Sequence, residues 1–214
     1  METDSFWTLI TDCRRQSLSG ERRDAWLRAA LRRLSPPDLV TFQASLDLVI
    51  GRAFTWNVWA AADRIFGGWC SDDTFCYFQH WMVGLGRPAF EAAVADADVL
   101  AYAPEVLRLS GRPRAAWPED AWPQWESLGW LAPEAYQQLT GAGEESGASF
   151  RAAARTLLDS AACRPPGLTP AGHRWSVLDE PESVRRLPRL TAMFPLGPAD
   201  DAAALVQTPL TRRI

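Results

Sequence analysis

Apolar residues along this chain recur at spacings of three and four, the period at which a helix buries one face. Longer helices are predicted over 5–15, 22–34, 36–51, 52–66 and 72–85, and shorter ones over 89–95, 98–102, 133–139, 150–162 and 180–193. No segment shows a convincing alternation of apolar and polar residues, the pattern of half-buried strands. The sequence therefore predicts an all-α fold, a single-domain multi-helix bundle with the strongly apolar 52–66 helix at its centre.

Prolines interrupt this helical pattern after Pro104, in a segment that is also rich in tryptophan. Its tryptophans are Trp117, Trp122, Trp125 and Trp130. Large aromatic side chains in an irregular connection usually pack onto the core. The alternative is a stacking surface for bases, sugars or a proline-rich peptide. We expect a Pro/Trp-rich irregular segment that packs mainly on the helices.

Two segments have the composition of loosely packed chain. Residues 141–149 are rich in glycine and serine, which is typical of a flexible loop. Residues 196–214 have weak apolar patterning. We therefore expect a single helical domain over 1–195, followed by a loosely packed C-terminal tail over 196–214.

The most distinctive stretch is Gly-Gly-Trp-Cys-Ser-Asp-Asp-Thr-Phe at 67–75. Its two glycines allow a sharp turn between two apolar segments. Ser71 is placed to cap the next helix, and Asp72 and Asp73 fall in its first turn, where carboxylates complement the helix dipole. At about 100° per residue, one face of this helix collects its polar residues. They are Asp72, Asp73, Cys76, Gln79 and His80, and this polar face is the predicted location of any chemistry.

Candidate residues for three roles come from this stretch. Asp72 and Asp73 are candidate catalytic carboxylates for a metal-assisted hydrolysis. Asp72, Cys76 and His80 carry ligand types that zinc accepts, although their spacing matches no established zinc motif. The candidate binding residues are Trp69, Ser71, Gln79 and His80. Motifs for a nucleophile elbow, a phosphate loop or a dinucleotide are absent, so no cofactor is expected.

The charge balance argues against two classes of partner. The 214 residues include 22 basic ones, all arginine, and 26 acidic ones, giving a net charge of −4. This balance disfavours double-stranded nucleic acid and anionic membranes as partners. The arginine-rich helix over 22–34 keeps nucleic-acid binding as a minor alternative, but such runs are usually solvated faces with acidic neighbours.

The four cysteines show no paired or framework spacing, which indicates free thiols. The acidic N-terminal residues do not resemble a signal peptide, and no run approaches the roughly 20 apolar residues of a membrane span. A cytoplasmic protein without a membrane segment is the expectation.

Several motifs recur together: FWxLI at 6–10, WNVWAAA at 56–62, GGWCSDDxFxxFxxW at 67–81, GRxxF at 86–90, AYxxLTG at 135–141 and LPRL at 187–190. This set resembles a bacterial family known as domain of unknown function 4240. Its members typically show an FWxLI start and a GGCSDDxFxxFxxWL segment, and Trp69-Cys70 here is one residue longer. The resemblance extends over roughly 5–195 and implies one all-α domain. Because the family has no established activity, it implies no catalytic residue.

These observations favour a small binding or regulatory module that works through protein contacts, including an inhibitor or immunity type of role. The alternative is a metal-assisted hydrolase that uses Asp72 and Asp73. The lack of a separate general base with supporting residues counts against an enzyme.

Overall fold

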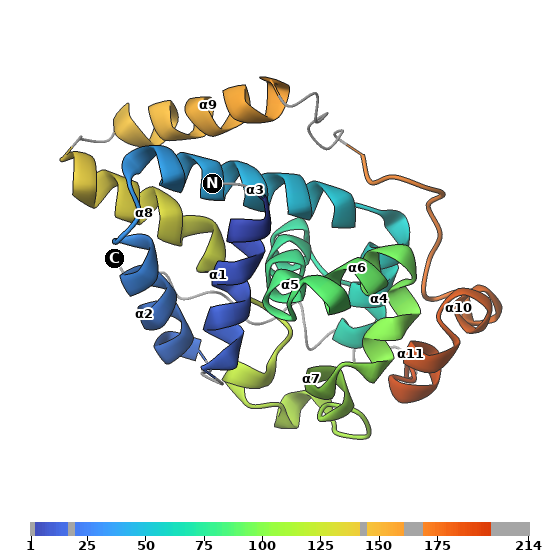
Figure 1. Ribbon diagram of the computed structural model, residues 1–214. Coiled ribbons are helices and arrows are strands. Elements are labelled where there is room, and N and C mark those ends of the chain that lie inside the picture. The colour runs from blue at the N-terminus through green and yellow to red at the C-terminus, as the bar shows by residue number, and fades with distance from the viewer. Residues whose placement is uncertain (1–2, 17–19, 142–144, 161–168, 198–214) are drawn as a thin grey trace.

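The computed structural model describes residues 3–16, 20–141, 145–160 and 169–197, and within them the protein is all-α (Figure 1). No strand occurs in these residues, and one isolated β-bridge joins Thr55 to Ala171. The longer helices are α1 (Thr3–Arg15), α2 (Gly20–Leu31), α3 (Pro36–Ala53), α4 (Trp56–Phe66), α5 (Asp72–Gly84), α6 (Arg87–Ala95), α8 (Leu128–Thr140) and α9 (Glu145–Ser160). The short ones are η1 (Ala97–Tyr102), α7 (Pro104–Leu107), η2 (Arg114–Ala116), η3 (Glu119–Ala121), α10 (Glu180–Arg186) and α11 (Pro188–Met193). The predicted all-α bundle is confirmed.

One continuous core joins the helices of this bundle. The helix α3 packs against α1, α5, α8 and α9, and Figure 1 shows α9 lying along it. The helices α4 and α5 meet through aromatic rings, with Trp59 stacked on Phe75 and the edge of Phe66 against Phe78. No helix of the described residues is long and apolar enough to cross a membrane.

Several element boundaries differ from the prediction, and three of the differences have an identifiable local cause. The break between α3 and α4 comes after Ala53 because the Thr55 side chain caps α4 by accepting from the Val58 amide. The helix α8 begins at Leu128, so that Pro133 lies inside it. The single helix predicted over 180–193 is two helices, α10 and α11, since Pro188 cannot continue the hydrogen bonding of α10.

The predicted loop over 141–149 is wrong in its second half. Residues 142–144 lie outside the described residues, but α9 already begins at Glu145 and contains Gly147. Phe150 and Ala154 on α9 are buried, and α9 packs against α3, so tertiary contacts outweigh the poor helix propensity of this start. The predicted tail over 196–214 lies almost wholly outside the described residues.

The Pro/Trp-rich segment is irregular and packs on the core, as predicted. Trp117 and Trp125 are buried, and Trp122 stacks on Phe66. Only short 3-10 turns, η2 and η3, interrupt it before α8. Trp130 differs from the others, because 56% of it is exposed on α8.

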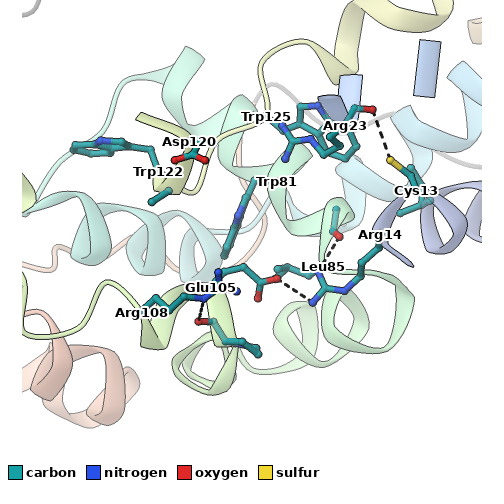
Figure 2. A pocket seen from close by; sticks show the side chains of 14 residues that line it. Cys13, Arg14, Arg23, Trp81, Leu85, Glu105, Arg108, Asp120, Trp122 and Trp125 are labelled. Atoms are coloured by element: carbon teal, nitrogen blue, oxygen red, sulfur yellow. Dashed lines mark hydrogen bonds and ion pairs between the residues drawn. The ribbon is translucent and has the colours of Figure 1, made fainter. Parts of the chain in front are cut away.

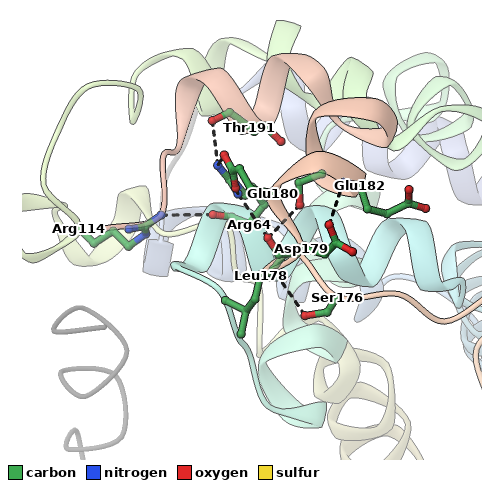
Figure 3. A network of polar contacts seen from close by, with 10 residues as sticks. Arg64, Arg114, Ser176, Leu178, Asp179, Glu180, Glu182 and Thr191 are labelled. Atoms are coloured by element: carbon green, nitrogen blue, oxygen red, sulfur yellow. Dashed lines mark hydrogen bonds and ion pairs between the residues drawn. The ribbon is translucent and has the colours of Figure 1, made fainter. Parts of the chain in front are cut away.

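Two polar contacts attach the C-terminal helices α10 and α11 to the rest of the bundle. The buried guanidinium of Arg64 on α4 pairs with both carboxylate oxygens of Glu180, at 2.6 and 3.0 Å, as Figure 3 shows. The buried carboxylate of Asp98 on η1 accepts hydrogen bonds from the amides of Arg189 and Leu190 at the start of α11. Residues about ninety or more positions apart are thus joined.

Candidate functional site

The Gly67-Gly68 turn between α4 and α5 depends on backbone angles that only glycine adopts easily. Gly67 ends α4 at a φ of 101°, and Gly68 has a φ of 109°. The Gly68 amide donates to the carbonyl of Asp63 at 2.7 Å, which satisfies one of the last acceptors of α4. A side chain at Gly67 would also meet the Arg114 guanidinium at 3.1 Å. The turn therefore requires both glycines.

The carboxylate of Asp63 holds the other end of this turn. Its Oδ1 accepts from the Cys70 amide at 2.8 Å, which draws Cys70 into the core, where 4% of it is exposed. Burial raises the pKa of Asp63 from 3.8 to about 6 and also raises the pKa of the Cys70 thiol. Cys70 is thus a buried structural residue, and the chain turns outward at Trp69.

The helix start at Ser71 has the predicted form. Ser71 Oγ accepts from the Thr74 amide at 3.1 Å and so caps α5. Asp72 and Asp73 follow in the first turn, and both are exposed. Neither carboxylate takes part in an ion pair within the described residues. The pair thus complements the helix dipole and gives the surface beside Trp69 two free negative charges.

The predicted polar face of α5 is divided, because its second half is buried. Only 3% of Gln79 and 6% of His80 are exposed, so these two candidate binding residues do not lie on the surface of α5. Gln79 Nε2 donates to the Ile50 carbonyl at 3.2 Å, and His80 Nδ1 donates to the Trp125 carbonyl at 3.1 Å. Both side chains therefore fix neighbouring segments and are not accessible to a partner.

The candidate zinc ligands do not form a metal site in the structure. His80 Nε2 lies 3.9 Å from Cys76 Sγ, a contact within one helix, whereas Asp72 is exposed at the helix start. Burial lowers the pKa of His80 to about 4 and raises the pKa of the Cys76 thiol. Within the described part of the chain, no three His, Cys, Asp or Glu side chains are grouped to hold a metal ion.

A pair of exposed apolar side chains lies at the turn instead. Trp69 is 57% exposed, and Leu178, from the segment before α10, is 71% exposed. Leu178 reaches the turn directly, since a Cβ on Gly68 would lie 3.2 Å from Leu178 Cδ2 (Figure 3). We call Trp69, Leu178, Asp72 and Asp73 the turn surface. Trp69, Asp72 and Asp73 are candidates from the sequence alone, but Leu178 joins them through a long-range contact with Gly68 that no local pattern indicates.

Arginine side chains near the turn surface are occupied by the fold. Arg114 donates to the carbonyls of Ile65 and Arg64, the last acceptors of α4, at 2.9 and 3.2 Å. Arg64 itself is buried and paired with Glu180. Among the residues of the turn and the start of α5, Asp72 and Asp73 are exposed and carry negative charge.

By its structure the protein is an all-α helical bundle in which a glycine turn exposes apolar and acidic side chains. Residues 1–138 match the family described as a protein of unknown function (DUF4240), and the chain belongs to this family. The match includes the helices from α1 to α7 and the glycine turn, so the resemblance read from the motifs is confirmed over these residues. No curated protein and no solved structure matches the chain.

Ser71→Ala is expected to lower the free energy of unfolding by about 1 kcal/mol, because the Thr74 amide loses its side-chain acceptor. Asp72→Asn retains the cap and removes only an exposed charge, so it should cost less. Urea denaturation of both variants at pH 7 measures the difference. Equal losses in the two variants would show that charge, and not the cap, starts this helix.

Asp63→Asn is expected to remove one component of the pH dependence of stability. The raised pKa of Asp63, about 6, means that the folded protein keeps this proton to a higher pH than the unfolded chain. Ionisation therefore destabilises the wild type progressively as the pH rises from about 4 to about 6. Asparagine still offers an oxygen to the Cys70 amide but does not ionise.

The Asp63→Asn variant should thus be more stable than the wild type above pH 6 and nearly equal to it near pH 4. Denaturant unfolding of both proteins at several pH values tests this. The titration of His80 does not affect the difference in stability, because both proteins contain this residue. A stability difference that stays constant with pH would contradict the raised pKa.

Proposed function

We propose that this protein is a binding module that recognises a protein partner through the turn surface. The observation that carries the proposal is that two exposed apolar side chains adjoin the glycine turn, Trp69 in the chain directly after it and Leu178 against Gly68, close in sequence to the exposed carboxylates of Asp72 and Asp73. Tryptophan is among the residues that contribute most to binding energy at protein interfaces. The proposed partner presents an apolar pocket for Trp69, surrounded by arginine or lysine, since Asp72 and Asp73 carry the local charge.

A regulatory role suits a surface of this kind, because the residues that hold the turn in place are different from the exposed residues that a partner would contact. Asp63, Gly67 and Gly68 fix the backbone, and Ser71 begins α5. Such a surface is pre-organised, so little conformational entropy is lost when a partner binds. The unpaired thiols of Cys13, Cys70 and Cys76 support a reducing, cytoplasmic environment for this interaction.

The alternative of a metal-assisted hydrolase has less support. It requires Asp72 and Asp73 to act with at least one further ligand or base. In the described residues, no third side chain of the kinds that bind metal joins them. We therefore place Asp72 and Asp73 at a binding surface.

The test is site-specific photo-crosslinking in cells of the source organism. A photoreactive phenylalanine analogue at position 69 should capture one defined protein, identified by mass spectrometry. The same analogue at position 130 is the matched control, because Trp130 on α8 is as exposed, at 56%, and Figure 1 shows α8 far from α10. The captured protein should then bind the purified chain directly.

For that purified pair, Trp69→Ala should weaken binding by about tenfold or more, and Trp130→Ala by less than about twofold. Replacing both Asp72 and Asp73 by asparagine should slow association and reduce its dependence on salt. The proposal is overturned if positions 69 and 130 capture the same proteins, or if Trp69→Ala leaves the affinity unchanged.

A further inference from the structure

A cavity of about 510 Å³ opens between α1, α2, α5, α7 and the segment over 120–125 (Figure 2). Its volume lies within the range of about 300–1,000 Å³ that is typical of small-molecule sites. It is separate from the turn surface, because none of the residues that line it belongs to that surface. Its residues come from five separate segments, so no sequence motif indicates it.

Charged side chains form part of the cavity wall. They are three arginines, Arg14, Arg23 and Arg108, and two acidic residues, Glu105 and Asp120. Arg14 pairs with Glu105, and Arg23 pairs with Asp24 at 3.6 Å, so Arg108 is the wall arginine that forms no ion pair within the described residues. Guanidinium groups of this kind favour an anion, and a carboxylate matches their planar geometry.

Two of these arginines are held in place by backbone carbonyls. Arg14 Nη1 donates to the Gly84 carbonyl at 3.1 Å, while its Nη2 lies 3.0 Å from Glu105 Oε1. Arg108 Nε donates to the Pro104 carbonyl at 3.1 Å. Because these side chains are already ordered, a ligand that pairs with them loses less entropy on binding.

Aromatic rings form the other part of the wall. The Arg23 guanidinium lies 3.9 Å from the ring centroid of Trp125, a cation–π contact that orients it. The Trp81 ring stacks on Phe78 in the core and also lines the cavity. In Figure 2, Trp81 lies between the Arg23–Trp125 pair and the contact of Arg14 with Glu105. A flat apolar ligand is complementary to this wall.

Part of the hydrogen-bonding capacity of the wall is unused. Glu105 Oε2 is shielded from solvent and has no hydrogen-bond partner, whereas Arg23 Nε, which also lacks a hydrogen bond, lies 3.6 Å from Asp24 Oδ1 in an ion pair. A buried acceptor is unfavourable when unpaired, so a small movement of the Glu105 side chain towards a ligand would be favourable. The unpaired Glu105 oxygen specifically requires a donor on the ligand.

We propose that this cavity binds a small aromatic carboxylate that carries a hydroxyl or amino donor. The ligand carboxylate pairs with Arg108, the wall arginine that forms no ion pair within the described residues. Its ring lies against Trp81, and its donor group reaches Glu105. The protein is thus a receptor for a small organic acid, independently of the partner proposed for the turn surface.

Isothermal titration calorimetry with three probes tests the proposal on the full chain. The probes are 3-hydroxybenzoate, benzoate and phenol, which together separate the contributions of the charge and the donor. We expect 3-hydroxybenzoate to bind more tightly than benzoate, and phenol to bind about tenfold or more weakly than 3-hydroxybenzoate.

Matched variants locate the site. Arg108→Gln alters an exposed side chain and should leave the melting temperature nearly unchanged, yet weaken 3-hydroxybenzoate binding by about tenfold. Arg22→Gln removes an exposed arginine of α2 that does not line the cavity, so binding should change by less than about twofold. The proposal fails if no probe binds below about 10 mM, if phenol binds as tightly as 3-hydroxybenzoate, or if both variants weaken binding equally.

Discussion

Glu180→Ala is expected to lower the free energy of unfolding by about 3 kcal/mol, although 55% of the Glu180 side chain is exposed. The cost arises at its partner, because Arg64 is completely buried and would keep its charge without a carboxylate. Two carbonyl acceptors, Val177 O at 3.4 Å and Thr191 O at 3.1 Å, would remain for the guanidinium. They satisfy hydrogen bonds but do not neutralise the charge.

Arg64→Met should cost less than Glu180→Ala, and this order is the specific consequence of the geometry. Removal of Arg64 leaves Glu180 unpaired, but water can solvate its half-exposed carboxylate. Methionine also fills much of the buried volume with apolar atoms. In a symmetric surface ion pair, the two variants would instead cost about the same, and both costs would be small.

Urea denaturation of Glu180→Ala, Arg64→Met and the control Glu21→Ala measures these differences. Glu21 lies in the first turn of α2 as Glu180 does in α10, so the control removes a charge from a helix start without breaking a buried pair. Hydrogen bonding from Arg64 holds the pKa of Glu180 below its usual 4.5. The stability supplied by the pair is therefore present above about pH 4.5 and lost as the pH falls further. A loss for Glu180→Ala no larger than for Glu21→Ala would contradict this account.

Local physical chemistry explains which parts of the fold were predictable. Helices from α1 to α6 follow from apolar spacing, and the caps by Ser35, Ser71 and Asp179 involve residues within a few positions of each other. Errors arose where a local signal was outweighed. The glycine and serine residues of 145–149 favour a loop, but burial of Phe150 and Ala154 extends α9 through them.

The candidate site was predictable to the extent that it depends on the α4–α5 connection. The glycine turn and the Ser71 cap were predicted, because chain neighbours produce both. The burial of Gln79 and His80 was not, since their partners Ile50 and Trp125 lie 29 and 45 positions away. Helical periodicity identifies residues on one face of α5, but it does not indicate which part of that face another segment buries.

Asp98→Ala is the second variant with a large expected effect, and it acts on α11. Only 1% of Asp98 is exposed, and its carboxylate accepts from the amides of Arg189 and Leu190 and from Arg189 Nη1 at 2.9–3.1 Å. These amides begin α11 and have no acceptor within their own helix. Alanine would leave them unpaired in a buried position, because Leu190 has no exposed surface. We expect a loss of about 3 kcal/mol, at least twice that of an ordinary cap.

Asp96→Ala is the matched control for this second variant. The Asp96 side chain accepts from the Asp98 amide at the start of η1, so it has the same chemistry, but it is exposed and should cost about 1 kcal/mol. Hydrogen exchange provides the local measurement. Asp98→Ala should accelerate exchange of the Arg189 and Leu190 amides far more than that of amides in α3, because the start of α11 opens before the bundle unfolds. Equal acceleration of exchange throughout the chain would show that Asp98 supports the whole core. A stability loss no greater than that of Asp96→Ala would show that water replaces the Asp98 carboxylate at the start of α11.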